Sequence, residues 1–255
     1  MNAEHGLGLS TRGGASAAIA FVDLAGFSAI TDVFGDESAL AVLDAFEELV
    51  TESLKQGGRL VKWIGDEVML AFPDPDAALR ALAQLLPACR ADLRLPLTRA
   101  GVHYGPVIPR GADFFGATVN IASRITASTS AGWVLATQPI AEVAAANGVT
   151  VEPLGPTSLR SVAERIPLFS IQMAAAVDAA WIDPVCKMHA PYSAYARSLP
   201  AGRWFCSPQC ELAFKRSPET YTSRLVSSAL SQSAQLFSDV RCKSRGRSVR
   251  AAHRK

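Results

Sequence analysis

Two short apolar runs that each lead to an aspartate place the strongest constraint on how this chain can fold. Residues 18–22 are almost all apolar and end at Asp23, as expected of a buried strand. Residues 59–64 and 68–72 are two further apolar runs, and the Gly-Asp-Glu sequence between them predicts a hairpin with Asp66 in its turn. Two carboxylates at strand ends could share divalent metal ions, which makes this pair the first candidate site.

Alternating helical and strand patterns surround these aspartates. Apolar residues recur every three or four positions from 40 to 54, which predicts an amphipathic helix that Gly57 and Gly58 end. The Pro-Asp-Pro-Asp sequence at 73–76 begins a second helix that reaches about Asp92. Further elements are expected as a strand at 97–108, a helix at 116–127, a strand at 133–137, a helix at 141–146 and a strand at 168–171. This alternation predicts an α+β domain in which helices flank a mixed sheet.

Changes in composition divide the chain into parts. With 255 residues, of which 49% are hydrophobic, the chain can bury one full core and has room for a small second module. Residues 241–255 hold seven of the 25 Lys and Arg residues and no acidic residue, so the rest of the chain is acidic. We expect a flexible N-terminus at 1–15, a main domain at 16–172, a linker at 173–181, a small domain at 182–226 and a disordered basic tail at 227–255.

The sequence also limits the compartment and the class of partner. It contains no apolar stretch of the roughly 18 residues that a membrane helix needs, and residues 1–14 lack the apolar core of a signal peptide. Its five cysteines are an odd number, with three between positions 186 and 210, which favours reduced thiols or a metal site over a disulfide framework. We therefore expect a cytoplasmic protein with no membrane span. No aromatic residue interrupts the charges of the basic tail, so no specific nucleic-acid contact is expected there.

A third motif gives the two aspartates a context. Residues 113–125 read Asp-Phe-Phe-Gly-Ala-Thr-Val-Asn-Ile-Ala-Ser-Arg-Ile, and they follow the motifs at 21–28 and 62–69 in order. Together the three motifs resemble the catalytic domain of class III adenylyl and guanylyl cyclases. The resemblance covers 16–172 and implies a ferredoxin-like sandwich. No phosphate-binding loop, dinucleotide fingerprint or catalytic-triad signature offers a competing interpretation.

The resemblance implies a reaction that depends on two metal ions. In this family the ribose 3′-hydroxyl attacks the α-phosphate, and pyrophosphate leaves. Asp23 and Asp66 match the metal-binding positions, and the carbonyl of Leu24 would complete a site for two Mg²⁺ or Mn²⁺ ions. The phosphates would be cradled by the backbone N–H groups of three consecutive residues, Gly26, Phe27 and Ser28.

The same resemblance assigns residues to the sugar, the developing charge and the base. Asn120 would orient the ribose, and Arg124, one helical turn later, would meet the charge on the α-phosphate. Lys62 and Asp113 match the two purine-reading positions, where a donor and an acceptor complement adenine and not guanine. Arg160 matches a late position that contacts the polyphosphate. The expected substrate is therefore ATP.

The family places these residues on two subunits. Metal-binding carboxylates of one subunit face the purine-reading and Asn/Arg residues of the other, in a head-to-tail dimer. Because this chain has one copy of each set, a homodimer would build two sites and a monomer none. We expect an adenylate cyclase that produces cyclic AMP in intracellular signalling. The alternatives are a guanylate cyclase, and a catalytically silent cyclase fold that serves as a metal sensor or scaffold.

The cysteines of the small domain have a spacing of their own. Cys186, Cys206 and Cys210 follow a Cys-x19-Cys-x3-Cys pattern, and their surroundings resemble a YHS domain, which is related to TRASH-type metal modules. Three thiolates with His189, Asp183 or water could complete a tetrahedral site for Zn²⁺ or another soft metal. A metal-free interaction module is the alternative.

Two further residues describe the geometry expected around these cysteines. Ser207 is expected to cap a helix, with Pro208 at its first position, so that Cys210 lies near the positive end of the helix dipole. Lys187 stands where the resembled family usually has a glycine.

Overall fold

The computed structural model describes residues 15–189 and 203–221. The expectations of flexibility at 1–15 and of disorder at 227–255 concern segments that lie outside these residues, apart from Ala15. The chain divides into one unit at 1–222 and another at 223–255, and every described residue belongs to the first.

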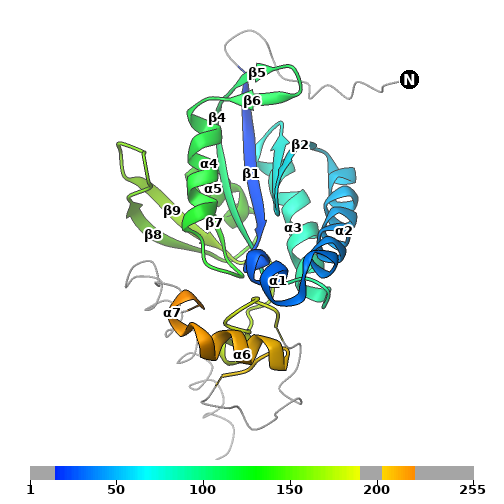
Figure 1. Cartoon of the computed structure of the whole chain (residues 1–255). Coiled ribbons are helices and arrows are strands. Elements are labelled where there is room, and N and C mark those ends of the chain that lie inside the picture. The colour runs from blue at the N-terminus through cyan, green and yellow to red at the C-terminus, as the bar shows by residue number, and fades with distance from the viewer. Residues whose placement is uncertain (1–14, 190–202, 222–255) are drawn as a thin grey trace, which may run out of the picture. The chain divides into compact units, whose positions relative to one another are not determined.

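A seven-stranded sheet forms the centre of the main domain (Figure 1). Its order is β2-β3-β1-β4-β7-β9-β8, and every neighbouring pair is antiparallel except β4 and β7. The strands are β1 (Ser16–Leu24), β2 (Arg59–Ile64), β3 (Glu67–Phe72), β4 (Thr98–Pro106), β7 (Val134–Ala136), β8 (Val151–Thr157) and β9 (Ile166–Ile171), with a separate hairpin of β5 (Ile108–Arg110) and β6 (Asp113–Phe115).

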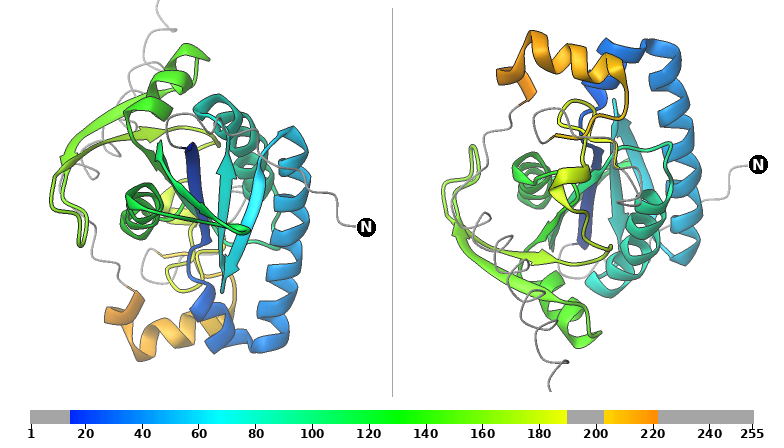
Figure 2. Two further views of the ribbon diagram at one scale, coloured as in Figure 1. Left: turned by 90° about the horizontal axis from the view of Figure 1, so that it is seen from above. Right: turned by 90° about the horizontal axis from the view of Figure 1, so that it is seen from below.

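Helices cover both faces of this sheet (Figure 2). Helix α4 packs on one face, and α2, α3 and α5 lie on the other. The helices are α1 (Phe27–Phe34), α2 (Asp36–Ser53), α3 (Pro75–Ala91), α4 (Ala117–Ser128), α5 (Gln138–Ala146), α6 (Pro208–Arg216) and α7 (Pro218–Tyr221), with short 3-10 turns at Leu54–Gln56 and Ala179–Trp181. The expected α+β class, a mixed sheet flanked by helices, is confirmed.

The central strand β1 is buried on both faces, which explains its nearly continuous apolar sequence. Ile19 and Phe21 pack on the α4 side, while Ala20 and Val22 join the larger core on the opposite side. Asp23 follows the alternation of Ile19 and Phe21 and therefore belongs to the α4 face. The buried strand thus fixes the face on which its terminal carboxylate stands.

Local signals in the sequence predicted several elements well. The hairpin of β2 and β3 has Asp66 in its turn, and the side chain of Asp74 caps α3 by accepting a hydrogen bond from the Ala77 N–H at 2.8 Å. Three features were missed, namely α1, β8 and the β5–β6 hairpin. Helix α1 has only eight residues and starts at a glycine without a side-chain cap, so it carries little sequence signal.

The described part of the C-terminal segment packs on the main domain. Val185, Cys186 and Cys210 belong to the same hydrophobic cluster as Leu24 and Ile30. Helix α6 begins as expected, with Ser207 Oγ accepting a hydrogen bond from the Cys210 N–H at 3.1 Å. The proposed boundary at 173–181 remains a prediction, since two segments can be separate in origin and still share a core.

Within 15–189 and 203–221, none of the helices combines the length and the apolar character that crossing a bilayer requires.

Candidate active site and thiol cluster

Asp23 lies at the end of β1 between two charged residues of the neighbouring strands. The strand register places Glu67 of β3 opposite Asp23 on one side and Arg99 of β4 opposite it on the other. Arg99 Nε donates a hydrogen bond to Asp23 Oδ2 at 2.5 Å. Directly opposed residues have Cβ atoms about 5 Å apart, so the three side chains share one small region.

Asp66 joins this region from the β2–β3 turn. Its backbone carbonyl accepts a hydrogen bond from the Leu24 N–H at 3.4 Å, which ties the turn to the end of β1. Burial, and then the negative charge of Asp23, raise the pKa of Asp66 to about 6. The same two causes raise the pKa of Glu67 to about 7. Asp23, Asp66 and Glu67, hereafter the carboxylate cluster, therefore repel one another and would be stabilised by a cation.

The chain turns sharply after β1, directly beside the carboxylate cluster. Gly26 has a φ of 82°, in the left-handed region that glycine adopts without strain, and its carbonyl accepts a hydrogen bond from the Ala29 N–H at 3.0 Å. Phe27 and Ser28 begin α1, with Ser28 exposed. We call residues 25–28 the Gly26 turn. It places the first N–H groups of a helix next to the carboxylates. Free N–H groups at a helix N-terminus can bind an anion.

Lys62 and Asp113 come from separate strands and form an ion pair. Lys62 Nζ donates to Asp113 Oδ2 at 2.6 Å, and Asp113 Oδ1 accepts a hydrogen bond from the Phe114 N–H at 2.7 Å. The hydrogen bond from Lys62 lowers the pKa of Asp113. These two side chains, hereafter the purine pair, are brought together by the fold although 51 positions separate them in the sequence.

Asn120 and Arg124 lie one turn apart on α4, and both are exposed. Within the described residues, no hydrogen bond or ion pair joins either of them to the carboxylate cluster or to the purine pair. Arg160 is exposed in the connection between β8 and β9. Within the described residues, it too has no hydrogen bond or ion pair to the carboxylate cluster or the purine pair. Within the described residues of one chain, these candidate residues are therefore not joined into a single hydrogen-bonded network.

Two charged residues of this region were missed by sequence reasoning. Glu67 follows Asp66 directly, and only the register of β1 with β3 reveals that it faces Asp23. Arg99 is 76 positions from Asp23, and only the pairing of β1 with β4 brings the two together. Strand register depends on the packing of the whole sheet, so a single sequence carries no direct signal for either contact.

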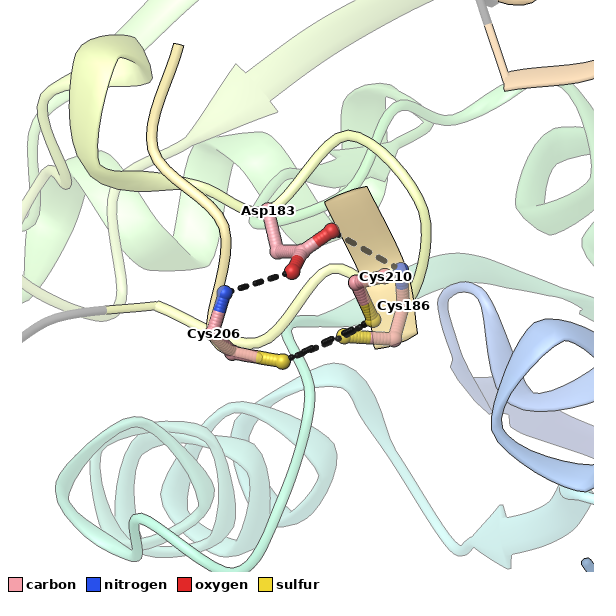
Figure 3. Close-up of side chains that lie close together, drawn as sticks. All are labelled: Asp183, Cys186, Cys206 and Cys210. Atoms are coloured by element: carbon pink, nitrogen blue, oxygen red, sulfur yellow. Dashed lines mark hydrogen bonds between the residues drawn. The ribbon is translucent and has the colours of Figure 1, made fainter. Parts of the chain in front are cut away.

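The three cysteines of the C-terminal segment converge on one point, as Figure 3 shows. The sulfur of Cys206 lies 3.4 Å from that of Cys186 and 3.6 Å from that of Cys210, and the remaining sulfur pair is 3.7 Å apart. Potential ligand atoms of Asp183 and the three cysteines all lie within 4.8 Å of one another. We call these four residues the thiol cluster.

Asp183 is fixed in the thiol cluster by the backbone around it. Its Oδ1 accepts a hydrogen bond from the Val185 N–H at 2.8 Å, and its Oδ2 accepts one from the Cys206 N–H at 2.7 Å. His189, another fourth ligand considered from the sequence, instead contacts the carbonyl of Arg90 through Nε2 at 3.0 Å. Of the two side chains considered, the structure brings Asp183 to the sulfurs.

Local geometry prepares the thiol cluster for an ion. Contacts with Cys186 and then Cys206 lower the pKa of the Cys210 thiol to about 5, whereas the pKa values of the Cys186 and Cys206 thiols are raised, so Cys210 is the cysteine that most readily supplies a thiolate. Lys187 has a φ of 58°, the conformation in which glycine is favoured, and this explains why a glycine is usual at that position in the resembled family.

Comparison with known protein sequences gives three matches of note. The family described as "Diguanylate cyclase, GGDEF domain" matches residues 3–112. The chain is 31% identical over 176 residues to a pH-sensitive adenylate cyclase of Mycobacterium tuberculosis, covering 68% of this chain and 44% of that protein. It is 36% identical over 126 residues to an adenylate cyclase of Streptomyces coelicolor, covering 49% of this chain and 33% of the relative. The chain thus spans less than half the length of these curated relatives.

A solved structure shows the same fold. Adenylate cyclases of Trypanosoma brucei in their monomeric state match with a TM-score of 0.56 and 19% identity, over 64% of this chain and 92% of theirs. The sequence matches and this structure together confirm the resemblance to a class III cyclase catalytic domain that the three motifs predicted, and the main domain has that fold. The resemblance of the C-terminal segment to a YHS domain stays a prediction, since these matches do not bear on it.

Proposed function

We propose that this protein is an adenylate cyclase that converts ATP into 3′,5′-cyclic AMP and pyrophosphate. The observation that carries the proposal is the convergence of Asp23, Asp66 and Glu67 beside the Gly26 turn, on a cyclase fold. This arrangement supplies carboxylates for metal ions and backbone N–H groups for phosphates at the same place. Similarity to two named adenylate cyclases supports the same activity.

The carboxylate cluster fits the Mg²⁺ or Mn²⁺ ions that such chemistry uses. Its ligands are hard oxygens, and the raised pKa values of Asp66 and Glu67 reflect burial and then repulsion from Asp23, which a divalent ion would offset. Asp23, Asp66 and the carbonyl of Leu24 would hold two ions. Bound there, the ions would favour ionisation of the ribose 3′-hydroxyl and offset the charge of the triphosphate. Metal binding by Asp23 would weaken the hydrogen bond that Arg99 donates to it.

The residues of the chain itself would position the nucleotide and stabilise charge. The N–H groups of Gly26, Phe27 and Ser28 would bind phosphate oxygens at the positive end of α1. Asn120 would hold the ribose, and the guanidinium of Arg124 would meet the charge that develops on the α-phosphate. Arg160 would add a contact to the polyphosphate. No covalent nucleophile is required, because the substrate supplies both the attacking hydroxyl and the leaving group.

The purine pair favours ATP over GTP. Lys62 can donate to N1 of adenine, and Asp113 can accept from the amine at C6, whereas guanine presents the opposite pattern at both positions. The hydrogen bond between the two side chains, at 2.6 Å, keeps them together at one site. An incoming adenine would replace that bond with one to each partner.

The presence of one copy of each candidate group per chain supports a head-to-tail homodimer. The carboxylate cluster of one chain would face the purine pair, Asn120 and Arg124 of the other, which gives two equivalent sites. A cytoplasmic location remains part of this proposal. The C-terminal segment would act as a metal-binding or redox-sensitive module that tunes the output.

Conversion of ATP and of GTP by the purified full-length protein, with Mg²⁺ or Mn²⁺, tests the proposal. We expect cyclic AMP as the main product and its loss in Asp23→Ala. The matched control is Asp32→Ala, which removes a carboxylate of α1 that belongs to none of the candidate groups. If the intact protein produces no cyclic nucleotide with either metal, the alternative of a catalytically silent sensor or scaffold is favoured. Cyclic GMP as the main product would favour the guanylate cyclase alternative.

A further inference from the structure

The thiol cluster has the dimensions of a tetrahedral metal site. Zn–S bonds of about 2.3 Å at tetrahedral angles place sulfur atoms about 3.8 Å apart. The three observed separations are 3.4, 3.6 and 3.7 Å. The carboxylate of Asp183 offers a fourth ligand, and Asp183, Cys186 and Cys210 are buried while Cys206 is exposed, so the cluster is covered on all but one side. The cluster therefore fits one ion that accepts three thiolates and an oxygen.

The loop at 183–187 is built around this cluster. The Lys187 N–H donates to the carbonyl of Asp183 at 3.1 Å, and the Asp183 N–H donates to the carbonyl of Met188 at 2.8 Å. Asp183 Oδ1 also accepts hydrogen bonds from the N–H groups of Val185 and Cys186, as in a capped turn. Two of the four proposed ligands, Asp183 and Cys186, lie in this loop, so an ion would fix its conformation directly.

The same loop lies directly against the Gly26 turn. A Cβ added at Gly26 would lie 2.9 Å from the carbonyl carbon of Cys186 and 2.9 Å from Cγ of Lys187. Such distances leave no room for a side chain, so the backbone of Cys186 fills the space beside Gly26. Gly26 is thus required both for its positive φ and for this close approach.

Backbone hydrogen bonds connect the two segments through a third. The Ala25 N–H donates to the carbonyl of Leu97 at 2.9 Å, and the Leu97 N–H donates to the carbonyl of Lys187 at 3.0 Å. Leu97 is almost fully buried, so neither bond can be replaced easily by water. A displacement of the 183–187 loop would therefore change the support of the Gly26 turn by two routes, packing and hydrogen bonding.

We propose that one Zn²⁺ ion, or a similarly thiophilic divalent ion, binds Asp183, Cys186, Cys206 and Cys210 and holds the 183–187 loop against the Gly26 turn. Loss of the ion then loosens the turn that binds the phosphates and weakens nucleotide binding at a site far along the sequence. The effect on nucleotide binding rests on the proposed cyclase function. The binding of the ion rests on the thiol cluster alone. The proposal assigns the fourth ligand and makes the ion an activator of the cyclase site.

The metal content of the full-length protein, purified under reducing conditions, tests the site itself. We expect about one Zn²⁺ per chain, and thiolate-to-metal absorption in the near ultraviolet after exchange for Co²⁺. Cys206→Ser should lower the zinc content, whereas Cys89→Ala, which removes a buried thiol of α3 outside the cluster, should retain it. Protein that binds no zinc, or that joins Cys186 to Cys206 in a disulfide under these conditions, would overturn the proposal.

Binding of a non-hydrolysable ATP analogue with Mg²⁺ tests the coupling. Loss of zinc in Cys206→Ser should weaken this binding on the order of tenfold relative to Cys89→Ala. Because zinc content and analogue binding need no turnover, they remain measurable even if the protein makes no cyclic nucleotide. Unchanged analogue affinity in a zinc-free, folded variant would refute the coupling while leaving the cyclase assignment intact.

A second variant keeps every proposed ligand. Lys187→Gly removes the side chain that contacts Gly26 and suits the backbone φ of 58°. We expect full zinc content and a decrease in analogue affinity of about threefold. If both zinc content and affinity stay at the parent values, the contact between the loop and the turn does not carry the effect, and the proposed route is wrong.

Discussion

The carboxylate cluster and the thiol cluster are two groups of candidate metal ligands built in opposite ways. The first consists of hard oxygens at strand ends, and the residues proposed to complete it come from a second copy of the chain. The second consists of soft sulfurs and one buried carboxylate, drawn together by a single chain within 4.8 Å. An open, shared site suits ions that arrive with a substrate, and a closed site suits an ion that stays.

The comparison predicts that the two clusters should respond to different changes. Removing a ligand from the carboxylate cluster should stop catalysis and leave the thiol cluster loaded. Removing a ligand from the thiol cluster should weaken catalysis only through the Gly26 turn. The following changes, from the largest effect to the smallest, can break or sharpen this distinction.

Asp66→Ala should have the largest effect. The metal ions supply several kcal/mol of transition-state stabilisation, so we expect kcat to fall on the order of a thousandfold or more. The zinc content of the protein should stay at the parent value. A variant that lost zinc together with activity would show that the two clusters are not separate.

Arg124→Ala should follow closely. A guanidinium that meets charge only in the transition state contributes to kcat more than to KM, and we expect a loss of about 10²- to 10³-fold in kcat. Steady-state kinetics with varied ATP measure this split. If KM rises while kcat is unchanged, Arg124 binds the ground state and has no special role in the reaction.

The double substitution Lys62→Glu with Asp113→Cys should change the base and little else. It replaces the Lys62 donor with an acceptor and the Asp113 acceptor with a weak donor, which reverses the hydrogen-bond pattern offered to the base. The ratio of kcat/KM for ATP to that for GTP should fall about 10- to 100-fold, because each reversed hydrogen bond costs about 1–3 kcal/mol. An unchanged ratio would remove the purine pair from base recognition.

Glu67→Gln should produce the smallest effect, on stability. Because the pKa of Glu67 is raised from 4.5 to about 7, the folded state retains its proton more tightly than the unfolded state. Stability should therefore fall as pH rises from about 4.5 to 7, and Glu67→Gln should remove this loss. Solvent screening of this half-buried side chain limits the gain to about 1 kcal/mol at pH 8.

Thermal unfolding without added divalent ions, at pH 4 and pH 8, measures that gain. The variant should exceed the parent at pH 8 and match it at pH 4, and added Mg²⁺ should reduce the difference. Equal stability of the parent and the variant at both pH values would mean that burial and the charge of Asp23 do not raise the pKa of Glu67.

Much of the scaffold around the carboxylate cluster was predictable from local sequence. The buried run before Asp23, the hairpin around Asp66 and the cap at Asp74 all carry short-range signals that the structure follows. The cap at Ser207 was predicted in the same way. These features depend on a few adjacent residues, so the sequence alone is sufficient for them.

The contacts that join distant segments could not be predicted in this way. Arg99 reaches Asp23 only because β4 pairs with β1 in one register, and Lys187 reaches Leu97 only because the C-terminal segment packs on the main domain. The choice of Asp183 over His189 likewise depends on how the loop closes. Each of these is set by tertiary packing, which a single sequence does not encode in any short pattern.

Mixing two inactive variants tests the central claim of a shared site most directly. Asp66→Ala and Arg124→Ala should each be nearly inactive, and mixed dimers should contain one site with both residues intact. If subunits exchange freely at equal concentrations, half of the dimers are mixed and one of their two sites works, so cyclic AMP production from ATP should recover to about a quarter of the parent rate. A mixture that forms dimers but stays as inactive as its separate components would contradict the account.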